Sequence, residues 1–69
     1  MMSAIKWINK YSREEGFVKS IKKNEGHFEN TYDLSEARQY KSEKSAKKAI
    51  DMLNSIGEGE NNEFVIVAV

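Results

Sequence analysis

The run Phe64-Val65-Ile66-Val67-Ala68-Val69 is the feature that most constrains the fold of this chain. Successive side chains of a strand point to opposite faces, so a strand here is apolar on both faces. A strand with two apolar faces favours a central place in a sheet. One helix can cover only one of these faces, and we expect the other face to meet something else.

The segment before it, from about Glu43 to Ile56, has the pattern of an amphipathic helix. Ser42 is suited to cap its first turn, and Gly57 suits the left-handed position after its last turn. The apolar residues recur at spacings of three and four and share one face, namely Ala46, Ala49, Ile50, Leu53 and Ile56.

Extended patterns come before the helix. A first strand is predicted over about residues 4–11, where Ile5, Trp7 and Tyr11 alternate with Lys6, Ile8 and Lys10. Gly16 favours a hairpin turn into a second strand over Phe17–Ile21. A weaker third strand from His27 to Asp33 follows, and we expect it at an edge.

Between this strand and the helix, Asp33 followed by Glu36 is a capping-box pattern for one helical turn, with Leu34 and Ala37 facing inward. The rival interpretation is one continuous helix over residues 34–56. The second cap signal at Ser42 favours a break.

The order β-β-(β)-α-β predicts a single α+β domain over residues 1–69. We expect a small antiparallel sheet of three to four strands, with one main helix packed on one face. The strand order, and the face that the helix covers, stay open.

Composition bears on the size of the core, the cellular location and the charge of the chain. A chain of 69 residues has a small core, so oligomerisation would help it. Cysteine is absent and no apolar run approaches the roughly 20 residues of a membrane span, which favours a cytoplasmic protein without membrane association. Eleven basic residues balance eleven acidic ones, although residues 17–48 are enriched in basic residues and residues 49–69 contain only acidic charges.

Catalytic chemistry has little support. His27 is the single histidine and lacks the spacings of a metal site, so we expect a structural or exposed role for it. Crowded carboxylates at Glu25, Glu29, Asp33 and Glu36 are more often solvated or capping groups. We therefore expect no enzymatic activity, no metal and no cofactor.

Two binding surfaces remain. An aromatic sheet surface bordered by lysine is typical of single-stranded nucleic-acid binders, and its candidates are Trp7, Phe17, Lys19, Lys22 and Lys23. The other surface is the uncovered face of the last strand, which would bind a protein partner or form a homodimer through the sheet face. Its candidates are Phe64, Ile66 and Ala68 on one face, or Val65 and Val67 on the other.

At Ala37-x-x-Tyr40-x-Ser42-x-x-x-Ala46-x-x-x-Ile50, followed by the strand from Phe64 to Val67, the chain resembles small uncharacterised proteins of phages and prophages of Gram-positive bacteria. The resemblance implies a hairpin, a helix and a closing strand, and a role in binding a host or phage protein. Our first hypothesis is thus a non-enzymatic protein-binding module. Nucleic-acid binding is the alternative.

Overall fold

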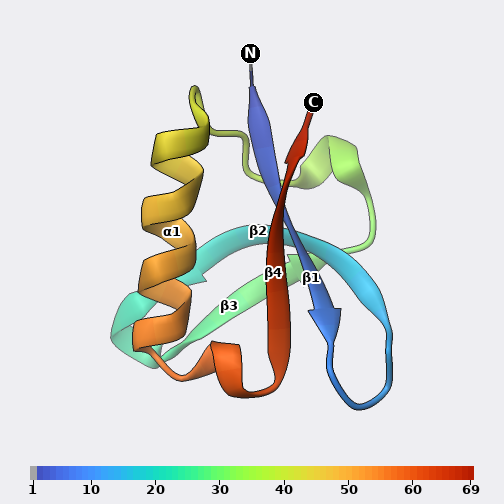
Figure 1. Cartoon of the computed structure of the whole chain (residues 1–69), viewed down its shortest axis with the longest axis vertical. Helices are drawn as coiled ribbons and strands as arrows, with labels where there is room; N and C mark the ends of the chain where they lie inside the picture. The colour runs from blue at the N-terminus through green and yellow to red at the C-terminus, as the bar shows by residue number, and fades with distance from the viewer. Residues whose placement is uncertain (1) are drawn as a thin grey trace.

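The computed structural model describes residues 2–69 and shows an α+β domain (Figure 1). Its antiparallel sheet has the strand order β3-β2-β1-β4, and one main helix packs on one face, as predicted. The regular elements are β1 (Ser3–Asn9), β2 (Glu15–Lys22), β3 (His27–Thr31), α1 (Glu43–Ser55) and β4 (Asn62–Ala68). Three short 3-10 turns, η1 (Lys23–Glu25), η2 (Leu34–Glu36) and η3 (Glu58–Glu60), join them.

The sheet is strongly twisted, so that β1 and β4 run together and cross β2 and β3 at a steep angle (Figure 1). Strand β1 pairs with β2 only over the second half of β1. Beside the first residues of β1, the segment that precedes α1 takes the place of β2. Tyr40 exchanges two backbone hydrogen bonds with Ser3, and the Arg38 N–H donates to the Val18 carbonyl. This segment satisfies backbone groups that the diverging strands leave free.

A β-bulge in β2 keeps its apolar residues on the helix side. The register with β3 shifts between Val18 and Ser20, so that Val18 lies opposite Asn30 while Ile21 lies opposite Phe28. The extra residue reverses the alternation and lets both apolar side chains reach one core. That core consists of Ile5, Trp7, Val18, Ala46, Ala49 and Leu53.

The predicted helix signals are confirmed. Ser42 accepts a hydrogen bond from the Ser45 N–H at the start of α1, and Gly57 has a left-handed φ of 91° after its end. The rival continuous helix over 34–56 is wrong, because Asp33 caps only the short turn η2 and Ala37 is already extended. Within that turn Leu34 is exposed instead of facing inward, whereas Ala37 is buried.

Tyr11 is also placed differently from the prediction. β1 ends at Asn9, and the Asn9 side chain accepts from the N–H groups of Tyr11 and Ser12, which forms the turn. Asn and Asp side chains form hydrogen bonds with backbone N–H groups two or three residues later, and these bonds compete with strand pairing. β1 therefore ends at Asn9, and Tyr11 is exposed.

The last strand is the main correction. We expected it at the centre of the sheet, but β4 is an edge strand and β1 lies at the centre. Ala4 and Ile5 of β1 are fully buried, whereas Phe64 to Val67 of β4 are only half-buried. The strand with the most completely buried faces occupies the centre, and β4 leaves apolar surface partly open.

Candidate binding edge

The outer edge of β4 carries backbone groups that point away from the sheet. The Val69 N–H donates to the Met2 carbonyl, and the Lys10 N–H donates to the Asn61 carbonyl. These two bonds show which residues of β4 direct their backbone groups towards β1 and which direct them away. In an antiparallel pair, alternate residues face the neighbouring strand. Val65 and Val67 therefore bond to β1, and the N–H and C=O groups of Phe64, Ile66 and Ala68 face outward.

We call the outward-facing backbone groups of Phe64, Ile66 and Ala68 the free ladder. Within residues 2–69, no strand lies beside it and no loop or turn hydrogen bond involves these groups. Such a row of unpaired donors and acceptors is a template for adding another strand. The side chains nearby are apolar, and Glu63 is the one charged residue of β4.

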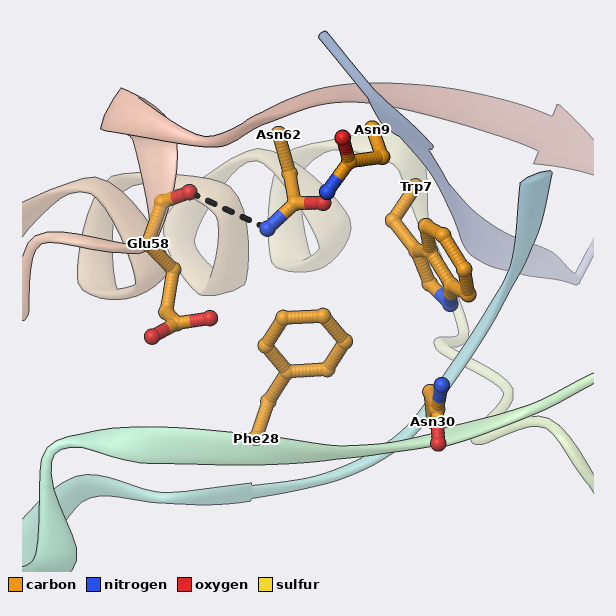
Figure 2. Close-up of a pocket in the computed structure, with 6 residues that line it drawn as sticks. All are labelled: Trp7, Asn9, Phe28, Asn30, Glu58 and Asn62. Atoms are coloured by element: carbon orange, nitrogen blue, oxygen red, sulfur yellow. Dashed lines mark hydrogen bonds between the residues drawn. The ribbon is translucent and has the colours of Figure 1, made fainter. Parts of the chain in front are cut away.

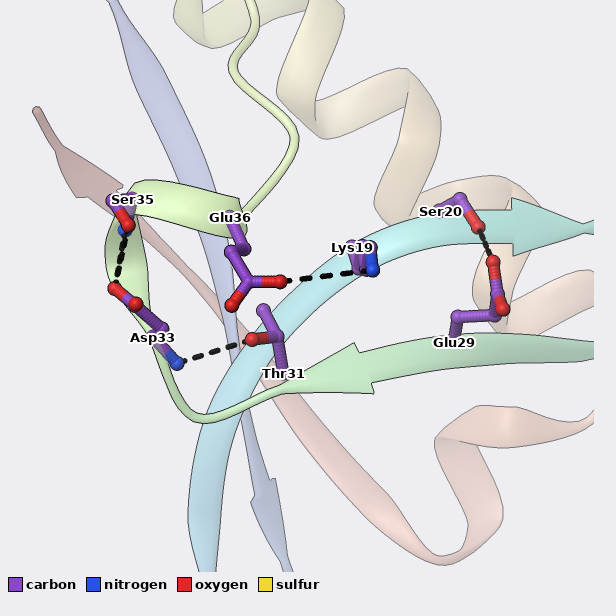
Figure 3. Close-up of polar contacts among 7 residues, drawn as sticks. All are labelled: Lys19, Ser20, Glu29, Thr31, Asp33, Ser35 and Glu36. Carbon is purple, nitrogen blue, oxygen red and sulfur yellow. Dashed lines mark hydrogen bonds and ion pairs between the residues drawn. The ribbon is translucent and has the colours of Figure 1, made fainter.

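The opposite edge, β3, has the usual protection against such pairing. It is short, it pairs with the bulged part of β2, and its residues other than Phe28 are polar. Glu29 on this edge accepts a hydrogen bond from the Ser20 hydroxyl (Figure 3), with 2.6 Å between the two oxygen atoms. The Glu29 carboxylate also lies 3.7 Å from Lys22 Nζ. Charges and bulges discourage edge-to-edge pairing. β4 has a regular register with β1, with no bulge, proline or lysine.

Two open cavities lie along the helix side of β4, one of about 520 Å³ towards its start and one of about 310 Å³ towards its end. We refer to the two cavities together as the groove. Ile50 and Asn54 of α1 face Phe64 in the first, and Glu43 faces Ile66 and Ala68 in the second. A strand added at the free ladder would place alternate side chains beside this groove.

The five candidate residues of the last strand divide between the two faces. Phe64 and Ile66 lie on the helix side and pack against the core, where Phe28 and Phe64 meet edge to face at 5.7 Å. Val65 lies opposite Lys6 and Val67 opposite Ala4, so both are on the other face. Ala68, on the helix side, is exposed.

The nucleic-acid candidates are not brought together. Trp7 lies opposite Gly16 and Phe17 opposite Lys6, which places the two aromatic rings on opposite faces. Trp7 is 5% exposed in the core and offers no stacking surface. Lys19 lies 3.7 Å from Glu36 and Lys22 lies 3.7 Å from Glu29, while Lys23 is in the following turn.

A separate hollow of about 300 Å³ opens beside Trp7, and its lining is rich in side-chain amides (Figure 2). The Asn62 amide donates to the Glu58 carbonyl at 3.4 Å, and Phe28 forms the opposite wall. The indole Nε1 of Trp7 is buried and has no hydrogen-bond partner among residues 2–69. Glu58 is the one carboxylate of the lining, and it lacks a second ionisable group for acid–base catalysis there.

The crowded carboxylates each have a local partner. Glu25 lies 3.4 Å from Nε2 of the exposed His27. Asp33 accepts from the Ser35 N–H and hydroxyl, and these bonds hold its pKa below the ordinary value. The Ser20 hydroxyl, and then Lys22, likewise lower the pKa of Glu29. Over residues 2–69, no three His, Cys, Asp or Glu side chains are grouped to hold a metal ion.

Comparison of the chain with protein-family models, curated proteins and solved structures finds no match. The resemblance to phage proteins therefore stays a prediction. In the part of the chain that the structure describes, no helix is both long and apolar enough to cross a membrane.

Sequence reasoning placed its candidate residues on the last strand and did not include the residues of α1 that line the groove. Ile50 belongs to the apolar stripe that we assigned to the core, and the helical pattern did not distinguish Glu43 or Asn54 from the other polar residues of the helix. The strand itself did not indicate an edge position, because residues 64–69 contain neither lysine nor proline, the residues that usually protect an edge strand.

Proposed function

We propose that this chain is a non-enzymatic protein-binding module that captures an extended segment of a protein partner at β4. The observation that carries the proposal is the free ladder of Phe64, Ile66 and Ala68 beside the groove under α1. Main-chain hydrogen bonds would supply affinity, and the groove would select alternate side chains of the segment. A host or phage protein, as the sequence resemblance implies, is the expected source of that segment.

The lining of the groove supports a segment that alternates polar and apolar residues. Its polar side chains include Lys10, Glu43 and Asn54, and its apolar side chains include Ile50, Phe64 and Ile66. An extended segment with apolar residues at every second position would bury these side chains and complete the half-buried face of β4.

The test is selection of displayed random peptides against the wild-type chain, followed by amide exchange measured by NMR. Peptides that alternate apolar and polar residues should be recovered, and binding should slow exchange at Phe64, Ile66 and Ala68. Val65 and Val67 are internal controls, since their amides already bond to β1.

A matched pair of variants tests the edge. Ala68→Pro removes one outward N–H of an exposed residue, so peptide affinity should fall at least about fivefold, the effect of one lost hydrogen bond of roughly 1 kcal/mol. Ala68→Thr keeps that N–H and should bind normally. If the selected peptides bind both variants equally, and the three outward amides exchange unchanged, the proposal is wrong.

A further inference from the structure

We infer that a second copy of this chain occupies the binding edge, with the two β4 strands antiparallel about a two-fold axis at Ile66. The inference rests on the proposed strand-addition site and adds that a second copy of the chain fills this site when no partner segment is bound. The resulting dimer would have one continuous eight-stranded sheet, because each copy contributes four strands.

The register follows from the free ladder. Phe64, Ile66 and Ala68 are spaced symmetrically about Ile66. A two-fold axis there places Ile66 opposite the partner's Ile66 and Phe64 opposite the partner's Ala68. Each of these pairs exchanges two backbone hydrogen bonds in an antiparallel ladder, so every outward N–H and C=O of the free ladder acquires a partner.

The side chains in this register are complementary. On the helix side, the large Phe64 lies opposite the small Ala68 of the partner subunit. On the other face, Val65 lies opposite the partner's Val67, a pair of β-branched residues that stabilises sheets. Residues 64–68 contain no charge, so no like charges meet across the axis.

Two features of the fold favour a second copy over unlimited association. Two-fold pairing uses the β4 edge of both chains and leaves outward only the two β3 edges, which are short and mostly polar. A two-fold interface of this kind closes, so assembly should stop at the dimer. The half-buried apolar side chains of β4 also gain cover in a chain whose own core is small.

The experiment measures the mass of the wild-type chain by sedimentation from micromolar to about millimolar concentration, together with amide exchange at both ends of that range. We expect a monomer–dimer equilibrium in which the amides of Phe64, Ile66 and Ala68 become protected only in the dimer. Those of Val65 and Val67 should be protected at both ends. A monomer throughout, or a dimer whose three outward amides exchange freely, overturns the inference.

Complementary charges test the register. Val65→Glu and Val67→Lys each set a charge against a valine of the partner subunit, and each should weaken self-association at least about tenfold. Mixed in equal amounts, they should recover a heterodimer, because Glu at position 65 of one chain then faces Lys at position 67 of the other. If the wild type dimerises but the mixture associates no better than either variant alone, the Ile66 axis is wrong.

The two proposals fail separately. A chain that stays monomeric yet protects its outward amides on binding a selected peptide overturns the dimer and supports the protein-binding site. A dimer protected at these amides supports this inference even if no displayed peptide binds. If the outward amides are protected in neither experiment, both proposals are wrong.

Discussion

At the scale of single residues, Gly16 and Trp7 show how little tolerance the core has. The Trp7 indole lies against Gly16, and a Cβ added at that glycine would lie 2.6 Å from Trp7 Cζ2. In an interior packed this closely, one added methyl group forces neighbouring atoms to shift and lowers the stability of the fold. Glycine is needed here because of close approach, not because of its φ.

Gly16→Ala should therefore lower the free energy of unfolding by about 1–3 kcal/mol, the usual effect of overpacking. Trp7→Phe removes the indole atoms that the new methyl would meet, and it also removes the buried, unpartnered Nε1–H. In the double variant the two effects should be less than additive by at least about 0.5 kcal/mol, measured by urea unfolding.

Gly57→Ala serves as the control for this pair of substitutions, since a methyl group added at Gly57 meets no atom within 4 Å. Combined with Trp7→Phe, it should give additive changes. Full additivity at Gly16 as well would mean that the indole does not occupy the position described.

The Ser20–Glu29 hydrogen bond gives a prediction about pH. This bond, more than Lys22, holds the pKa of Glu29 below its ordinary value, so Ser20→Ala should raise that pKa in an NMR titration. A carboxyl whose pKa is lower in the folded state stabilises the fold above its unfolded pKa, and this contribution is lost as the pH falls through the folded pKa. An unchanged pKa in Ser20→Ala would assign the shift to lysine.

At the scale of elements, β4 shows how one strand serves two purposes. Its odd-numbered residues Val65 and Val67 bond to β1 and hold the strand in the sheet. Its even-numbered residues direct their backbone groups outward. Proline can therefore separate the two ladders, because it removes the N–H of a single residue.

Val67→Pro should destabilise the isolated domain by about 2–4 kcal/mol more than Ala68→Pro, because only Val67→Pro leaves a β1 carbonyl without its donor. Urea unfolding at a concentration low enough to avoid association measures this difference. Equal losses in the two variants would show that the alternation of β4 is opposite to the one described.

At the scale of the whole molecule, the even balance of charges agrees with the proposed dimer interface, which does not depend on electrostatics. The chain has a formal net charge of zero at pH 7, and residues 64–68 are uncharged. Screening by salt acts on charged pairs and has little effect on apolar contacts and backbone hydrogen bonds.

The dissociation constant of the proposed dimer should therefore change less than about threefold between roughly 0.05 and 0.5 M NaCl. Nucleic-acid binding, the alternative function, would weaken steeply over the same range. Sedimentation at the two salt concentrations, and a parallel assay with labelled single-stranded oligonucleotide, separate these cases. A dimer that dissociates at high salt would indicate a charged interface elsewhere.

The sequence by itself determined the elements that depend on local chemistry. Ser42 and Gly57 mark the ends of α1 because a hydroxyl cap and a left-handed glycine act within a few residues. The apolar stripe of α1 also predicted the buried residues Ala46, Ala49 and Leu53, since helical periodicity places them on one face.

The position of β4 in the sheet was decided by tertiary structure alone. Its apolar pattern suits a central or an edge strand, and the choice depends on which neighbours reach it across the chain. β1 pairs on both sides and is the more deeply buried, so β4 was left at the edge with Phe64, Ile66 and Ala68 directed outward. Side-chain periodicity shows which face of a strand is apolar, but only long-range pairing determines which backbone groups stay free.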